Sequence, residues 1–348
     1  MKVAIDKNKI NEIKNFKEFD YVYLFEEEKY EDLKKLNIHC LHKDYAEDID
    51  LNLTKYNIPC LKKASIKDKA WKKPIKKKNY KFAIIVPNCN NDRGNYQGKT
   101  YLQNCIESIL NQTYKNFELI IVDDMSTDTS VETVDNYVDN RIHLIKNKRK
   151  RYNGGSRNVG IEYALDNFEF DYFCFLDSDD WWKHNKVLEH INRKLYNHDL
   201  MILGAEMLFP DGNTLAAYNK YDTYEDIYFC INKVWCTCWS KVIRKDKIVY
   251  FCEDTLMEDR VWSYKLADNV DFDKIVNINE ICYVWNRLNT DNSVSIVGGN
   301  IWEASAWCHI GHQLQFLTKM KHQEMKPKLQ ERINTCINKV NRKEYQQY

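Results

Sequence analysis

The sequence predicts an α/β protein whose main domain is a largely parallel sheet flanked by helices. Three apolar, strand-like runs alternate with segments of helical periodicity, at residues 82–87, 117–124 and 172–176. Strands separated by helices imply right-handed βαβ crossovers, which place successive strands parallel in one sheet. Two of the runs end in aspartates, and the carboxyl ends of parallel strands meet at one edge of a sheet. The sequence therefore predicts a ligand site at that edge.

Each element of the main domain has its own local signal. Pro87 ends the first strand, and an amphipathic helix is expected over 100–110. The second strand is followed by a Ser126-Thr127-Asp128 turn and a helix from about Thr129. A third strand is expected over 141–146. Asn153-Gly154-Gly155 then predicts a flexible turn before a helix, which leads into the strand that ends near residue 176.

Composition and charge set the broad class. The chain has 348 residues, is 44% hydrophobic and 13% aromatic, and carries a formal net charge of +1. This composition predicts a folded globular protein with no global electrostatic preference for a partner. No apolar run approaches the roughly 20 residues of a membrane span, and the first residues lack a signal-peptide core, so we expect a cytoplasmic protein. The 12 cysteines show no CxxC pair and are expected to be reduced.

Three parts are expected along the chain. Residues 1–75 predict a small α/β accessory unit, 76–298 the main domain, and 299–348 a helical C-terminal extension. Lysines crowd the stretch from Lys62 to Lys81, with Asp68 as its only acid. A solvated linker is the favoured interpretation of this stretch. The alternative is a basic patch that binds nucleic acid or makes peripheral contact with an anionic membrane.

The segment YFCFLDSDDWW organises the main domain. Its apolar strand stops at four polar residues, Asp177, Ser178, Asp179 and Asp180. Carboxylates crowded at a strand end repel one another, and a divalent cation bridged to a phosphorylated ligand relieves the repulsion. Mg²⁺ or Mn²⁺ suits this role because both prefer oxygen ligands and complete their shell with phosphate and water. The alternative is that Asp179 or Asp180 caps a helix before Trp181.

A series of motifs then points to one enzyme family. IIVPNCN, SILNQTYKNFELIIVDDMSTD, NGGSRNVGIEYA and YFCFLDSDDWW follow one another in order, and WCTCWSKVIRKD, FCEDTLMEDRVW and YVWNRLNTDNSVS continue the series. From about Phe82 to Ser295 the chain resembles the GT-A fold, family 2 glycosyltransferases. The resemblance implies a Rossmann-like, mostly parallel sheet flanked by helices. It also implies an inverting, metal-dependent transferase of hexosyltransferase type that uses a nucleotide-diphosphate sugar.

The resemblance implies roles for individual residues. Expected to bind the nucleotide sugar are Pro87, Asn88, Asn90, Asp123, Asp124, Asn153, Arg157, Asp177, Ser178, Arg287 and Ser293. Asp179 is expected to hold Mn²⁺ or Mg²⁺ directly, and Asp177 to lie nearer the ribose or sugar while contributing to the metal site. The alternatives are helix capping for Asp123 and Asp124, and a surface salt bridge for Arg157.

The catalytic base is expected in the segment MEDRVW. In this family the second acid of such a pair is the base, so Asp259 is the candidate and Glu258 is expected to help bind the acceptor. Inversion requires a carboxylate that deprotonates the acceptor hydroxyl opposite the departing diphosphate. Glu253 and Asp254 are the alternatives. Arg287 is expected to neutralise the diphosphate near a closing loop that carries Asn292, Ser293 and Ser295.

Two departures from the family pattern bear on specificity. Cys89 and the longer NDRGNYQGK segment stand where a tyrosine and an acid are usual, so an insertion is expected where the nucleotide enters. No QxxRW pattern follows the base, which disfavours a processive polysaccharide synthase.

His309 and His312 have helical spacing, and we expect packing or surface roles for them rather than metal binding.

The expected reaction is the transfer of one sugar from a UDP-sugar to a hydroxyl group of a glycan, protein or lipid-linked sugar. A first alternative, suggested by the lysine-rich stretch, is a glycosyltransferase acting on modified bases in DNA. Two others are an inactive GT-A binding module and a nucleotidyltransferase. The two intact acid pairs disfavour an inactive binding module. The lack of a glycine-rich basic loop after the first strand disfavours a nucleotidyltransferase.

Overall fold

The computed structural model describes residues 2–5, 21–24, 79–148, 152–217, 237–288 and 300–342. The chain forms two compact units, residues 1–78 and 79–348. In the first unit, β1 (Lys2–Ile5) and β2 (Tyr21–Leu24) pair in parallel, with Lys2 opposite Tyr21. The predicted helical segments of this unit and residues 62–78 of the lysine-rich stretch lie outside the described residues.

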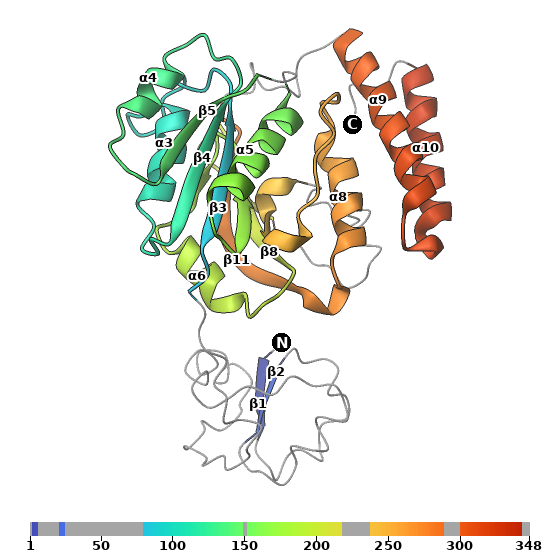
Figure 1. Cartoon of the computed structure of the whole chain (residues 1–348), viewed down its shortest axis with the longest axis horizontal. Coiled ribbons are helices and arrows are strands. Elements are labelled where there is room, and N and C mark those ends of the chain that lie inside the picture. The colour runs from blue at the N-terminus through green and yellow to red at the C-terminus, as the bar shows by residue number, and fades with distance from the viewer. Residues whose placement is uncertain are drawn as a thin grey trace. The chain divides into compact units, whose positions relative to one another are not determined.

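A large mixed sheet forms the centre of the second unit (Figure 1). Its order is β5-β4-β3-β6-β10-β8-β11-β7, and β9 pairs with β8. The strands are β3 (Phe82–Asn88), β4 (Phe117–Asp123), β5 (Ile142–Lys146), β6 (Tyr172–Phe175), β7 (Trp181–Trp182), β8 (Leu200–Leu208), β9 (Thr214–Ala217), β10 (Lys241–Arg244) and β11 (Ile275–Asn286). The half formed by β5, β4, β3 and β6 is parallel, as predicted.

The other half of the sheet mixes both strand directions. β10 runs antiparallel to β6 and to β8, whereas β11 runs parallel to β8 and antiparallel to β7. The prediction of a mostly parallel sheet came from the βαβ alternation before residue 177, which does not extend to these later strands. The predicted α/β class is nevertheless confirmed, with helices on both faces of a sheet and a helical C-terminal tail.

Alternating side chains of the central strands pack against helices on opposite faces. Phe82, Ile84 and Val86 join the core with α3 (Tyr101–Leu110) and α6 (Val187–Lys194). Ala83 and Ile85 face the core that includes α5 (Asn153–Asn167) and α8 (Glu258–Asn269). The strands are therefore apolar on both faces, as buried parallel strands require. The short helix α4 (Ser130–Asp135) lies on the same side as α3 (Figure 1).

Local signals explain where the helices begin. Thr100 caps α3, since its hydroxyl accepts from the amide of Gln103 while the Gln103 side chain accepts from the Thr100 amide. The predicted flexible turn at residues 153–155 is wrong, because α5 already begins at Asn153. Gly160 lets α5 approach the sheet closely, since an added Cβ would lie 2.6 Å from a methyl group of Ile85.

The C-terminal helices belong to the same unit as the sheet. α9 (Asn300–Lys319) and α10 (Lys326–Asn341) form a hairpin beside α8 (Figure 1). Their apolar side chains share one core with Trp262, and they include Ile310, Phe316, Leu329 and Ile333. This hairpin supports α8, and α8 begins at the Glu258-Asp259 pair.

Candidate active site

The DSDD segment is a tight turn between two strands. β6 ends at Phe175 and β7 begins at Trp181, so no helix follows for Asp179 or Asp180 to cap. Asp180 is buried, and its carboxylate accepts hydrogen bonds from the Tyr283 hydroxyl and, at 2.7 Å, from the Asn286 amide. Asp180 therefore fastens the turn to β11. Asp177 and Asp179 are more exposed than Asp180, so a ligand can reach their carboxylates.

The charge at this turn favours a bound cation. Burial, and the neighbouring charge of Asp177, raise the pKa of Asp179 to about 6, against the positive charges of Arg93 and Arg287. A divalent metal would relieve this repulsion. Two carboxylates are what Mg²⁺ or Mn²⁺ commonly takes from a protein when phosphate and water fill the remaining positions. The donor set of Asp177 and Asp179 thus fits such a metal.

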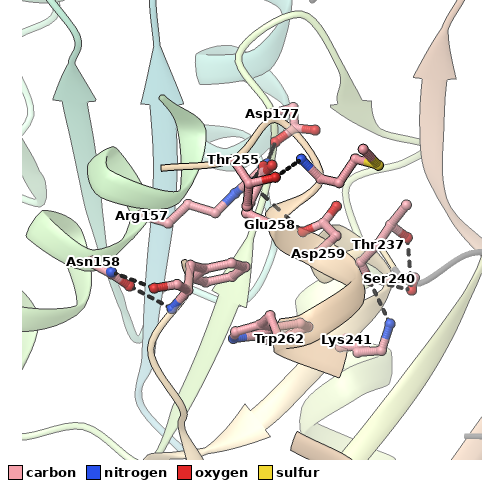
Figure 2. A network of polar contacts seen from close by, with 12 residues as sticks. Arg157, Asn158, Asp177, Thr237, Ser240, Lys241, Thr255, Glu258, Asp259 and Trp262 are labelled. Carbon is pink, nitrogen blue, oxygen red and sulfur yellow. Dashed lines mark hydrogen bonds and ion pairs between the residues drawn. The ribbon is translucent and has the colours of Figure 1, made fainter. Parts of the chain in front are cut away.

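Arg157 lies at the centre of a cluster of carboxylates (Figure 2). Its side chain is 2% exposed and donates to Asp177 Oδ1 at 2.7 Å and to Glu258 Oε1 at 2.6 Å. The same guanidinium lies 3.8 Å from Asp259 Oδ1. Arg157 therefore joins the turn after β6 to the first residues of α8. The alternative of a surface salt bridge is wrong, because this arginine is buried.

The two acids of α8 have perturbed pKa values. Burial and the adjacent charge of Asp259 raise the pKa of Glu258 to about 7, although the charge of Arg157 and its hydrogen bond act in the opposite direction. Burial also raises the pKa of Asp259, and the charge of Arg157 opposes that shift. Asp259 keeps 27% of its side chain exposed, against 8% for Glu258. Asp259 is thus the acid of this pair that solvent or a substrate can reach.

Two contacts hold the segment before α8 in place. Asn158 is buried and its side-chain amide pairs with both backbone groups of Phe251, and it also donates to Glu253 at 2.8 Å. A Cβ at Gly154 would lie 2.2 Å from the carbonyl oxygen of Cys252, so only glycine fits there. The first turn of α5 therefore packs directly on the chain that leads to the Glu258-Asp259 pair. Sequence reasoning missed this role of Asn158.

A second polar group lies at the ends of β3 and β4. Asn88 and Asp123 are buried and joined by a 3.3 Å hydrogen bond, and Ser126 bonds to both of them. Asp124 accepts a hydrogen bond from the buried side chain of Asn147 at 2.9 Å. Neither aspartate caps α4, which begins at Ser130 without a side-chain cap. These acids are therefore placed at the predicted sheet edge.

The other predicted residues occupy varied positions. Pro87 is buried within β3, whereas Asn153 is exposed at the start of α5. Asn90 accepts from the backbone amides of Thr127 and Asp128. Arg287 lies 4.7 Å over the Trp285 ring, and Ser178 accepts from Asn91 at 2.6 Å. Residues Asn292, Ser293 and Ser295 lie outside the described residues.

Histidines form separate contacts. His309 is buried against Gln313, and His312 pairs with Asp254.

In the described parts of the chain, one group of three side chains has the spacing of metal ligands, at His184, His190 and Glu280. The backbone amide of Lys186 donates to Nδ1 of His184, which leaves the proton on Nε2 facing Glu280. Lys194 also approaches Glu280, so this group is an ion-pair cluster.

Comparisons with known proteins agree with this geometry. Residues 83–248 match the family model described as Glycosyl transferase family 2. An uncharacterized glycosyltransferase of Haemophilus influenzae is 40% identical over 111 residues, 31% of this chain and 43% of that protein. The Escherichia coli protein named UDP-Glc:alpha-D-GlcNAc-diphosphoundecaprenol beta-1,3-glucosyltransferase WfgD is 34% identical over 126 residues, 36% of this chain and 46% of its own. The alignments thus span less than half of these relatives.

The fold has solved neighbours. The crystal structure of Staphylococcus aureus TarS residues 1–349 in complex with UDP-GlcNAc aligns with a TM-score of 0.57 and 19% identity, over 72% of this chain and 70% of that one. Residues 83–248 are thus similar to the family 2 glycosyltransferases, and the chain shares the fold of its solved GT-A neighbours, so the resemblance seen in the sequence is confirmed. Among the described residues, no helix has both the length and the apolar character needed to cross a bilayer.

Proposed function

We propose that the protein is an inverting, metal-dependent glycosyltransferase that moves one sugar from a UDP-sugar to an acceptor hydroxyl. The observation that carries this proposal is that the buried Arg157 joins two acid pairs, through Asp177 in the DSDD turn and through Glu258 and Asp259 at the start of α8. One pair, Asp177 and Asp179, stands at the sheet edge where nucleotides bind in α/β proteins. The other pair, Glu258 and Asp259, forms the start of α8.

The donor side supplies groups that suit a nucleoside. The buried acids Asp123 and Asp124 are acceptors, which match the ribose hydroxyls and the imide N–H of uracil. UDP is the default nucleotide, and the name of the E. coli relative WfgD, a UDP-glucose transferase, is consistent with it. We assign Pro87, Asn88 and Asn90 to the neighbourhood of the base.

Asp179 and Asp177 would hold Mn²⁺ or Mg²⁺ beside the diphosphate. When bound, the metal would neutralise negative charge on the leaving phosphates. Arg287 lies near this turn, since its positive charge also acts on Asp179. Arg157 has a different task in this proposal. Because both its NH groups are engaged by carboxylates, it positions Asp177 and Glu258 and keeps its charge near Asp259.

Asp259 is proposed as the base. Its Oδ1 atom is buried and faces Arg157 at 3.8 Å, but 27% of the side chain is exposed, so the carboxylate can accept a proton from an incoming hydroxyl. The nearby alternatives are already engaged: Glu253 accepts from Asn158, and Asp254 pairs with His312. Glu258 is tied to Arg157 and is assigned to acceptor binding.

The acceptor is proposed to be a hydroxyl of a glycan, a lipid-linked sugar or a protein. The diphosphoundecaprenol acceptor in the name of WfgD favours a lipid-linked sugar among these. A base in DNA stays the alternative, and the lysine-rich stretch that suggests it lies mostly outside the described residues. The cytoplasmic location and the division into three domains also stay predictions.

A screen of nucleotide sugars for slow hydrolysis would test this function without knowledge of the acceptor. The purified protein is incubated with UDP-, GDP-, ADP- and dTDP-sugars, each with Mn²⁺, with Mg²⁺ or with EDTA. We expect metal-dependent release of UDP from at least one UDP-sugar. Release that is equal in EDTA would refute the metal requirement, and release of another nucleotide alone would refute UDP as the donor nucleotide. No release from any donor would refute the enzymatic function.

A further inference from the structure

The loop between β3 and α3, residues 89–99, is firmly held. The carboxylate of Asp92 accepts hydrogen bonds from the hydroxyls of Thr100, Thr129 and Thr133, and these bonds lower its pKa although burial acts in the opposite direction. The backbone amide of Asp92 also donates to Asp128 at 3.0 Å. The loop is therefore fixed to the turn after β4, where Asp123 and Asp124 stand.

The following residues of the loop turn back toward α3. Gly94 has a φ of +70°, and an added Cβ would lie 2.3 Å from the Tyr101 ring, so glycine is needed here. The backbone amide of Tyr101 donates to the carbonyl of Arg93 at 2.9 Å, and Tyr96 and Lys99 form a short antiparallel bridge. Arg93 thus extends from a closed and well-defined backbone turn.

The same loop is joined to the DSDD turn. Asn91 donates from its side-chain nitrogen to Ser178 at 2.6 Å and accepts from Nε of Arg93 at 3.1 Å. Tyr96 stacks on Trp181, with ring centroids 4.8 Å apart and an interplanar angle of 20°. One asparagine side chain therefore links Arg93 to the serine between Asp177 and Asp179.

This arrangement brings the charge of Arg93 to the metal-binding turn. The positive charges of Arg93 and Arg287 both act on the carboxylate of Asp179. Arg93 comes from the β3–α3 loop and Arg287 follows β11, so the two guanidinium groups reach the turn from separate parts of the chain. The diphosphate gains negative charge as it leaves the sugar, beyond what a single divalent ion neutralises, and a planar guanidinium is well suited to phosphate oxygens.

We propose that Arg93 is a donor-binding residue that contacts the diphosphate of the nucleotide sugar and shares its charge with Arg287. This inference rests on the proposed function, because it assumes a nucleoside diphosphate at the DSDD turn. It also gives the NDRGNYQGK segment a role, because the extra residues place the positive charge of Arg93 near the DSDD turn. The residues at the end of β3 itself carry no such charge.

Calorimetric titration of the full chain with UDP, UMP and uridine in the presence of Mn²⁺ would test the inference. Arg93→Gln should weaken UDP binding by roughly ten-fold or more, because hydrogen bonds to charged groups are the strong ones. Uridine binding should stay unchanged. Arg93→Lys should recover part of the UDP affinity, since it keeps the charge without the planar fork. Lys99→Gln is the matched control: it removes one positive charge from the same loop, but Lys99 is exposed and paired with Glu107.

Several outcomes would overturn the proposal. Wild-type UDP affinity in Arg93→Gln, or an equal loss in Lys99→Gln, would show that Arg93 makes no specific contact. A parallel loss of uridine affinity would show that the arginine only maintains the loop. Failure of the proposed function looks different, since the wild-type protein itself would then fail to bind UDP. If it instead bound another nucleoside diphosphate in an Arg93-dependent way, the choice of UDP would be wrong and the role of Arg93 would stand.

Discussion

Two ionic clusters in this domain have opposite compositions. Around Arg157, one buried cation faces three carboxylates, those of Asp177, Glu258 and Asp259. Around Glu280, one carboxylate faces three basic side chains, those of His184, His190 and Lys194. Both are small groups of ionisable residues brought together from distant parts of the chain. Only the cluster around Arg157 has more carboxylates than basic groups, so part of its negative charge is not neutralised.

The pKa values express this difference. Burial raises the pKa of Glu258 to about 7, and one arginine does not reverse the shift. Burial also acts to raise the pKa of Glu280, but the hydrogen bond from His190 and the surrounding positive charges outweigh it and leave the pKa lowered. The Glu280 cluster is electrostatically satisfied, whereas the Arg157 cluster favours a further cation or proton. Such an excess of buried negative charge is typical of a site that binds a metal or transfers protons.

Removal of the central cation should have the largest effect. Arg157→Met would leave three carboxylates without their buried partner, so we expect the free energy of unfolding to fall by about 3–5 kcal/mol and donor hydrolysis to be lost. Urea denaturation measures the stability. Lys274→Met is the control, since Lys274 pairs with Asp271 at the surface and its loss should cost less than about 1 kcal/mol. Equal losses in the two variants would contradict the central place given to Arg157.

Removal of the base should affect the rate but not donor binding. Asp259→Asn keeps the shape of the side chain and cannot accept a proton, so donor hydrolysis should fall by roughly 10² to 10⁴ with UDP affinity nearly unchanged. Asp254→Asn and Glu253→Gln are the comparisons. A larger loss of rate in either of them than in Asp259→Asn would mean that the wrong carboxylate has been assigned.

The pH dependence follows from the raised pKa values. Asp259 acts as a base only when deprotonated, and its pKa is raised, so the rate should fall as pH decreases at a higher pH than an ordinary aspartate would give. The charge of Asp259 raises the pKa of the adjacent Glu258, and repulsion between two carboxylates is reciprocal. Glu258→Gln should therefore move the acid limb of the rate profile to lower pH. An acid limb that stays in place would argue against Asp259 as the titrating group.

The smallest effect is expected at the satisfied cluster. Glu280→Gln removes a partly exposed carboxylate, with 27% of its side chain accessible, from three basic neighbours. We expect a loss of less than about 1 kcal/mol in the free energy of unfolding and an unchanged rate of donor hydrolysis. Thermal unfolding and the hydrolysis assay check this. A severe loss of rate would place Glu280 in the catalytic machinery and remove the contrast between the clusters.

The sequence predicted the parts of the site that depend on strand ends. Buried apolar runs that stop at aspartates located the DSDD turn and the pair at residues 123 and 124. Glu258 and Asp259 were instead identified from the resemblance of MEDRVW to the family pattern, and the structure places them at the start of α8. These features are local, because periodicity and the residue types at an element's end are visible within a few positions of the chain.

Contacts between distant residues could not be predicted in this way. Arg157 meets partners 20 and 101 positions away, so its burial depends on how α5 and α8 pack together. Asp180 is held by Tyr283 and Asn286, which belong to a strand more than 100 positions later. Asn158 follows Arg157 in NGGSRN. A polar residue in a helix that packs on the sheet was the one sequence signal for its hydrogen bonds to the backbone of Phe251.

The metal dependence of UDP binding tests the central claim most directly. Calorimetry would compare UDP affinity with Mn²⁺ and with EDTA in the wild-type protein, in Asp179→Asn and in Glu280→Gln as the control. If the negative charge at the DSDD turn holds a metal beside the diphosphate, Mn²⁺ should tighten UDP binding on the order of ten-fold or more in the wild type and in Glu280→Gln. The enhancement should disappear in Asp179→Asn, while uridine affinity is retained. An equal enhancement by Mn²⁺ in Asp179→Asn would contradict the account.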